Sequence, residues 1–253
     1  MATTAEERAL ARATFYRALA LAFSYPTPEV TAEIREAFTT AAVAAELIDE
    51  STRASVTRAR AALEPLRPAD LEKAYQQTFT LSYSEDCPLY ETAFSARHLF
   101  QQAQQQADLA GTYQAFGVRG RIERPDHLAV ELEFSYLLAL KEARARHEQE
   151  GDHIQICRDA SRAFLRQHLA RWAPLVGRRV AVTGAGTWYE VAARALETFV
   201  AWEQRFLRVG AIEMFRDEPI IIAEEPGEMT CPVAEEAFAE LLDSPWKEHD
   251  RVS

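Results

Sequence analysis

Apolar residues recur along most of this chain at spacings of three and four, the pattern of amphipathic helices. Helix-start signals accompany it: Thr4 and Glu7 stand at capping-box spacing, and Pro28 and Pro68 stand where a first helical turn begins. The helices predicted from these signals cover residues 5–25, 28–47, 51–63, 71–81, 92–110, 126–149, 152–172, 187–209 and 232–242. Strand-like alternation is almost absent, so the pattern predicts an all-α, single-domain bundle of about nine helices.

Composition and charge refine this picture. The chain has 253 residues, 48% of them hydrophobic and only nine of them glycine, which is enough apolar material for a substantial helical core. The net charge of −11 argues against nucleic acid as a partner. Residues 211–253 carry 12 acidic and three basic residues, so we expect residues 1–210 to form the helical domain and 211–253 an acidic extension. That extension either attracts a basic peptide or serves as a solvated tail.

The sequence shows no run of about 18 apolar residues and no secretion-signal layout at its start, which predicts a cytoplasmic protein without stable membrane insertion. The three cysteines are far apart in the chain and form no Cys-x-x-Cys pair. Histidines and carboxylates show no metal-ligand spacing either, so no metal site and no cofactor is expected.

The segment Pro125 to Phe134 is the most informative stretch, because it places ionisable residues on a strongly apolar helix. Asp126 or Pro125 is positioned to start that helix, and His127 and Glu131 stand four apart, where they can pair. A carboxylate next to His127 would favour its charged form. The alternative interpretation is purely structural: a helix cap and a core histidine with its hydrogen bonds satisfied.

Two other stretches carry residue types typical of catalytic or nucleotide-binding sites. The loop around Cys87 offers a thiol beside carboxylates, and His98 or His127 could serve as its base, which leaves open a small cysteine-dependent hydrolase or transferase. The stretch Arg179 to Tyr189 has the look of a strand entering a dinucleotide-binding turn. Tyr189 stands where that turn needs its third glycine, so the stretch is interpreted as a connection between helices.

Four blocks occur in the order and spacing typical of one family. They are Arg12-x-x-Phe15-Tyr16-x-x-Leu19, Leu71-x-x-x-Tyr75-x-x-x-Phe79 with Cys87-Pro88-Leu89-Tyr90-Glu91, Pro125-Asp126-His127 with Glu131-Leu132-Glu133-Phe134, and Phe164-Leu165-x-x-His168-Leu169-x-x-Trp172. Together they resemble the redox-enzyme maturation chaperones of the TorD/DmsD/NarJ type, over roughly residues 8–209.

The resemblance implies a non-catalytic cytoplasmic chaperone, monomeric or homodimeric. Such a protein binds the apo catalytic subunit of a molybdenum/iron–sulfur oxidoreductase, through its twin-arginine leader or another segment, until the molybdopterin cofactor is in place. It does not enter the final enzyme. Carried over by position, the peptide-binding residues are Asp126, His127, Tyr90, Glu91, Glu131 and Glu133. Carboxylates beside an apolar helix suit a leader that joins an arginine pair to an apolar run. A helical scaffold without a peptide ligand is the remaining alternative.

Overall fold

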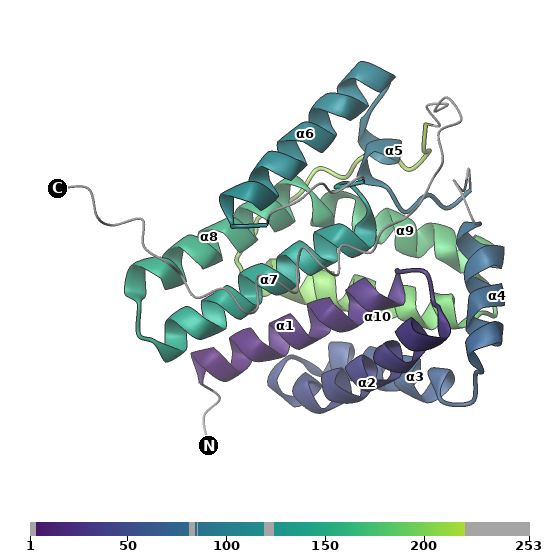
Figure 1. Cartoon of the computed structure of the whole chain (residues 1–253), viewed down its shortest axis with the longest axis horizontal. Helices are drawn as coiled ribbons and strands as arrows, with labels where there is room; N and C mark the ends of the chain where they lie inside the picture. Colours follow the sequence, from purple (N-terminus) through teal and green to yellow (C-terminus); the bar gives the residue numbers. More distant parts are fainter. Residues whose placement is uncertain (1–3, 81–83, 85, 119–123, 221–253) are drawn as a thin grey trace.

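The computed structural model describes residues 4–80, 84, 86–118 and 124–220, which form a bundle of helices (Figure 1). Within these ranges there are ten α-helices, one short 3₁₀ helix and no β-strand beyond a single isolated bridge. The elements are α1 (Ala5–Ala22), α2 (Pro28–Ala44), η1 (Ala45–Leu47), α3 (Glu50–Leu63), α4 (Pro68–Phe79), α5 (Glu91–Ser95), α6 (Leu99–Ala115), α7 (Leu128–His147), α8 (Gly151–Gln167), α9 (Leu169–Thr183) and α10 (Trp188–Phe206). The predicted all-α class is confirmed.

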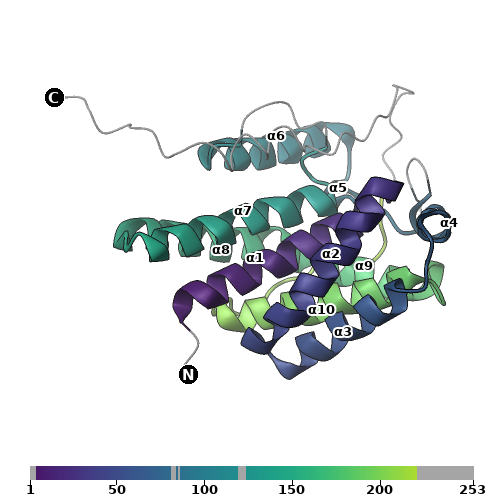
Figure 2. The same cartoon turned by 60° about the horizontal axis from the view of Figure 1, so that its bottom comes forward.

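The centre of the bundle is the pair α1 and α7, which pack against each other more extensively than any other two helices described. Helices α2 and α10 pack against α1, α3 packs against α2 and α10, and α8 and α9 complete the bundle beside α7 and α10. Helix α6 lies on the outer side of α7, away from α2 and α3 (Figures 1 and 2). Aromatic contacts such as the stacked Phe15 and Phe199 fill the space between α1 and α10.

Helix α1 begins as the sequence predicts, because both halves of the capping box form. Thr4 accepts a hydrogen bond from the backbone N–H of Glu7, and the Glu7 side chain accepts one from the backbone N–H of Thr4. The helix ends at Ala22, shortly before Pro26. A proline disfavours helical geometry in the residue before it, so the end of α1 is also set locally.

A buried arginine ties α1 to two other helices. Arg12 and Glu203 are both fully buried, and the Arg12 Nε lies 2.9 and 3.0 Å from the two carboxylate oxygens of Glu203. The Arg12 Nη1 lies 2.5 Å from Oε2 of Glu142 on α7, and the Tyr16 hydroxyl donates to Glu203 at 3.1 Å. Buried charges survive only when they are paired and hydrogen-bonded, as they are here. This network therefore fixes how α1, α7 and α10 sit against one another.

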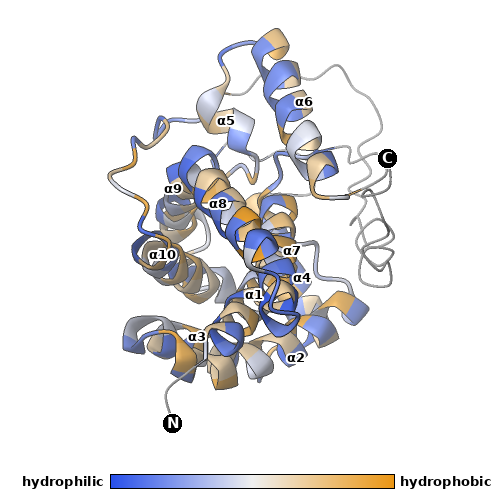
Figure 3. Cartoon of the chain, turned by 90° about the vertical axis from the view of Figure 1, so that its left-hand side faces the viewer, coloured by the Kyte–Doolittle hydropathy of each residue, from blue (hydrophilic) through white to orange (hydrophobic). Residues whose placement is uncertain are grey.

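A smaller second core holds α6 on the bundle. It joins Leu109 and Tyr113 of α6 to Phe134 of α7 and Phe164 of α8, with the Tyr113 and Phe134 rings 4.7 Å apart. The Tyr113 hydroxyl also donates to the backbone carbonyl of Pro125 at 2.6 Å. Hydrophilic and hydrophobic residues alternate along α6 (Figure 3), in keeping with a helix that packs through a narrow apolar stripe.

Two predicted helices are each broken in two, and these predictions were wrong. The chain does not form one helix over 92–110: it forms α5, an extended stretch, and α6, which continues to Ala115. The break occurs because His98 caps α6, its Nδ1 accepting a hydrogen bond from the backbone N–H of Gln101 at 3.3 Å. The helix expected over 152–172 breaks at His168, whose ring binds Glu91. These breaks place ten helices where eight were expected in the described ranges.

After α10 the chain runs back across the bundle as an arm, residues 211–220. The Phe215 backbone N–H donates to the Arg171 carbonyl at 3.1 Å, and the Ile220 N–H donates to the Ala93 carbonyl at 2.8 Å. The expected helix 232–242 lies outside the described residues. Among the helices that are described, none combines the length and the apolar character that crossing a bilayer requires.

Candidate peptide-binding site

Two motifs that are distant in the sequence, Cys87–Glu91 and Pro125–His127, meet at one point of the structure. Tyr90 and His127 form an isolated antiparallel bridge. The Leu128 N–H donates to the Leu89 carbonyl at 2.9 Å, and the Glu91 N–H donates to the Asp126 carbonyl at 2.8 Å. The Cys-Pro-Leu-Tyr-Glu loop and the Pro-Asp-His start of α7 are thereby fixed side by side. Five of the six predicted site residues are buried around this bridge, and Glu133 is half-buried.

Asp126 is a junction between chain segments. Its side chain is fully buried and accepts hydrogen bonds from the Thr92 hydroxyl at 2.5 Å, the Gln106 amide at 3.2 Å and the Arg124 Nε at 3.2 Å. These donors come from α5, α6 and the segment before α7. The sequence suggested that Asp126 caps α7, but it does not. Its carboxylate turns toward α5 and α6 and leaves the cap position to the next residue.

His127 caps α7, with its Nδ1 accepting the Ala129 backbone N–H at 3.1 Å. This bond requires an unprotonated Nδ1. Burial lowers the pKa of His127 to about 4, which outweighs the opposing influence of Asp126. The prediction that a carboxylate keeps His127 charged was therefore wrong, because desolvation dominates. The ring packs edge-on against Tyr90 with the two centroids 5.1 Å apart.

This geometry predicts acid sensitivity that originates at His127. The folded pKa lies below the unfolded value of about 6.5, so the unfolded chain binds more protons and stability falls as the pH drops through that window. His127→Asn keeps a cap acceptor without the titration. Between pH 7 and 4.5 we expect the parent to lose about 2 kcal/mol more unfolding free energy than this variant, measured by urea denaturation. Equal losses in the two proteins would contradict the assignment.

Glu91 and Glu131 form a buried acidic pair behind the bridge. The Glu91 carboxylate lies 3.0 Å from Nδ1 of His168, and the Glu131 Oε2 accepts a hydrogen bond from the indole N–H of Trp172 at 3.0 Å. Burial, with the nearby charge of Glu91, raises the pKa of Glu131 well above its usual value. Glu131 therefore partners Trp172 and not His127.

Sequence reasoning did not assign His168 or Trp172 to the site, although both appear in the fourth family-like block. Their spacing of four residues was the available signal, since it places both on one face of a helix. Because the helix breaks at His168, that spacing alone did not establish which neighbours they would contact.

Arg124 is a further residue of the site that sequence reasoning missed, as it missed Thr92 and Gln106. Its guanidinium carbon lies 3.8 Å from the centre of the Tyr90 ring, and its nitrogens reach both carboxylate oxygens of Asp126, at 3.2 and 3.4 Å. A planar cation is thus held between an aromatic face and a carboxylate, the arrangement that suits arginine best. The side chain keeps 17% of its surface exposed, so the position borders the solvent.

The family model described as "Nitrate reductase delta subunit" matches residues 45–177, about half of the chain and all of the site residues named above. The chain belongs to the nitrate reductase delta subunit family. The resemblance to NarJ-type maturation chaperones is thereby confirmed at the level of the family.

The chain is similar to the selenate reductase assembly chaperone protein of Thauera selenatis, with 44% identity over 61 residues. The match spans 24% of this chain and 31% of that relative's length. A crystal structure of a putative redox enzyme maturation protein from Archaeoglobus fulgidus is 22% identical, with a TM-score of 0.46 over 79% of this chain and 96% of that one.

Cys87 of this delta subunit family member has the features of a structural cysteine. The thiol is 1% exposed, and burial raises its pKa to about 12. A reactive cysteine needs a lowered pKa and access to solvent. Over the described ranges, no cluster of three or more histidine, cysteine, aspartate or glutamate residues could hold a metal ion.

Proposed function

We propose that this protein is a non-catalytic chaperone for the apo catalytic subunit of a molybdenum/iron–sulfur oxidoreductase. It binds the subunit's twin-arginine leader, or another segment, and retains it in the cytoplasm until cofactor insertion is complete. Membership of the delta subunit family and the similarity to a selenate reductase assembly chaperone support this role. The observation that carries the assignment of the site is the guanidinium of Arg124, held between Tyr90 and Asp126.

In this proposal Arg124 stands where an arginine of the leader binds. The carboxylate, the aromatic face and the partly open position together make a receptor for a guanidinium group. Asp126 is fully buried, so a charge at this position has to be balanced, and Arg124 supplies that balance in the free chaperone. An incoming arginine replaces Arg124 and leaves the charge balance of the site unchanged.

The proposal predicts a preference for arginine over lysine. A synthetic peptide with an Arg-Arg pair followed by an apolar run should bind at least about tenfold more tightly than its Lys-Lys counterpart, because only arginine offers a planar, bidentate fork. Isothermal titration calorimetry with the full chain measures both affinities. Equal affinities, or no binding of either peptide, would count against a twin-arginine site.

A second measurement tests the placement of the site. Arg124→Gln removes the competing guanidinium, so the Arg-Arg peptide should bind about three- to tenfold more tightly to this variant than to the parent. Arg58→Gln is a matched control, since Arg58 is an exposed residue on α3, remote from the site in sequence, and should leave the affinity unchanged. Weaker binding to Arg124→Gln would show that Arg124 supports the peptide and does not compete with it.

A further inference from the structure

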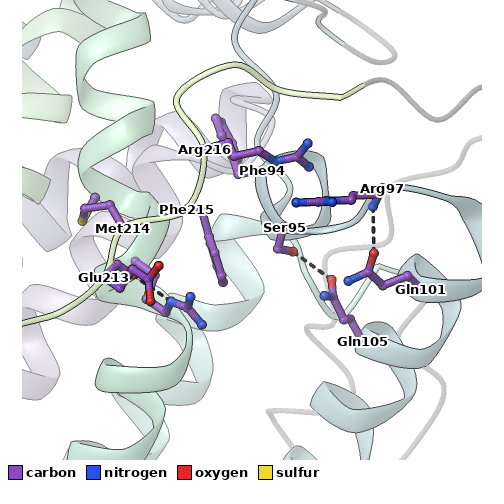
Figure 4. A pocket seen from close by; sticks show the side chains of 10 residues that line it. Phe94, Ser95, Arg97, Gln101, Gln105, Glu213, Met214, Phe215 and Arg216 are labelled. Carbon is purple, nitrogen blue, oxygen red and sulfur yellow. Dashed lines mark hydrogen bonds between the residues drawn. The ribbon is translucent and has the colours of Figure 1, made fainter.

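A cleft lies between the arm, residues 211–220, and the connection from α5 to α6 (Figure 4). This cleft of about 540 Å³ is lined on one side by Phe94, Ser95 and Arg97, and on the other by the arm residues Glu213 to Arg216. Gln101 and Gln105 of α6 and Arg171 of α9 complete the lining. The predicted site residues are not among those that line it.

The charge of the cleft is opposite to that of the whole chain. Its lining holds three arginines and one glutamate, in a protein whose net charge is −11. Arg171 is engaged, with its Nε donating to the Glu213 carbonyl at 3.0 Å and its guanidinium 3.9 Å from the centre of the Phe215 ring. Within the described residues, Arg216 donates one hydrogen bond, at 2.9 Å, to the Ala96 carbonyl. The exposed Arg97 lies beside Arg216 in Figure 4, so two guanidinium groups face the same space.

Polar donors and apolar surface surround this pair of arginines. The side chains of Gln101 and Gln105 reach the cleft from α6. Phe94, Met214 and Phe215 supply the apolar part of the lining, and Met214 is 36% exposed. A ligand that combines carboxylates with apolar side chains fits this lining. A twin-arginine segment does not, because its charge has the wrong sign.

The chain itself has a segment that combines carboxylates with apolar side chains, and the residue before this segment lies beside the cleft. Residues 221–253 hold nine acidic and two basic residues, together with apolar ones such as Ile221, Ile222 and Trp246. The residue before this segment, Ile220, is bonded to Ala93, the neighbour of the cleft residue Phe94. Glu224 follows four residues later, and four residues of chain span up to about 14 Å.

We propose that the cleft is a carboxylate-binding site and that its occupant is the chain's own acidic segment, residues 221–253. A short tether gives an effective concentration of the order of 1 mM, so contacts as weak as a Kd of about 1 mM suffice for half occupancy. Surface arginine–carboxylate pairs supply affinity of that low order when several act together. The proposal is independent of the peptide site at Asp126 and stands or falls separately.

Cys231 provides the probe for a test on the full chain. The other two cysteines are 1% exposed, and burial raises the pKa of Cys87 to about 12 and of Cys157 to about 11, so a thiol-reactive spin label is directed to Cys231. Paramagnetic relaxation enhancement of the Gln101, Gln105 and Phe215 amides reports docking. In Arg97→Gln/Arg216→Gln, and in about 1 M salt, we expect this enhancement to fall at least about threefold.

Two controls make the result decisive. Arg58→Gln, an exposed arginine of α3, should leave the enhancement unchanged, and Glu224→Gln/Glu225→Gln/Glu228→Gln, which alters no residue of the cleft, should lower it as the arginine pair does. The proposal is overturned if the enhancement is insensitive to all these changes. It is also overturned if spin-labelled chains broaden unlabelled ones in a mixture, since the occupant would then be a second copy. A loss of the enhancement on addition of a stoichiometric amount of an acidic peptide, which would displace the labelled segment from the cleft, supports the carboxylate site.

Discussion

Replacing Arg12 with alanine should lower the free energy of unfolding by about 3–5 kcal/mol, the largest effect expected of a single change here. Arg12 is fully buried, and it neutralises the fully buried Glu203 and the nearly buried Glu142. Alanine leaves two carboxylates without their common partner in a water-free interior. The measurement is chemical denaturation followed by circular dichroism.

The matched control is Arg17→Ala on the same helix. Arg17 pairs with Glu33 at 3.3 Å, but the two side chains are 50% and 38% exposed. Exposed pairs contribute little, so this change should cost less than about 1 kcal/mol. If Arg12→Ala and Arg17→Ala proved equally mild, the buried network would not be holding α1, α7 and α10 together.

Asp126→Ala should have the second-largest effect, about 2–4 kcal/mol, and that effect should be concentrated in α6. The change leaves the Thr92 hydroxyl, the Gln106 amide and the Arg124 guanidinium without their common acceptor. Helix α6 packs on the bundle mainly through its small apolar core, so loss of the Gln106 bond should loosen it first. Hydrogen–deuterium exchange should show that, relative to the parent protein, exchange accelerates more for the α6 amides than for the α1 amides.

Asp108→Ala is the control for that experiment, since Asp108 is an exposed residue of α6 itself. It should leave the exchange pattern as in the parent. Uniform acceleration over all helices in Asp126→Ala would indicate global destabilisation instead, and would remove the special link between Asp126 and α6.

Much of the fold follows from local sequence signals and was therefore predictable. The capping box at Thr4, the prolines that open α2 and α4, and the apolar periodicity set most helix bounds within a few residues. The breaks at His98 and His168 were not predictable in this way. Each depends on what the histidine contacts, a backbone N–H in one case and Glu91 on another helix in the other. The spacing of apolar residues does not predict such contacts.

The site was predictable as a set of residues but not as an arrangement. Family-like blocks singled out Tyr90, Asp126 and His127, and the structure brings them together through one bridge. Their roles depend on neighbours distant in sequence: Thr92 and Gln106 draw the Asp126 carboxylate away from the helix start, and burial keeps His127 neutral. Whether these residues bind a leader peptide stays a prediction.

Because Asp126 holds Thr92, Gln106 and Arg124 at once, one carboxylate is shared between a candidate receptor and the anchor of a helix. In the proposed complex a guanidinium takes the place of Arg124 on this carboxylate, and a ligand that also displaced Gln106 would release α6. Ligand binding at Asp126 and release of α6 would in that case be reciprocally coupled. The packing of α6 on the bundle would then differ between the free and the peptide-bound chaperone.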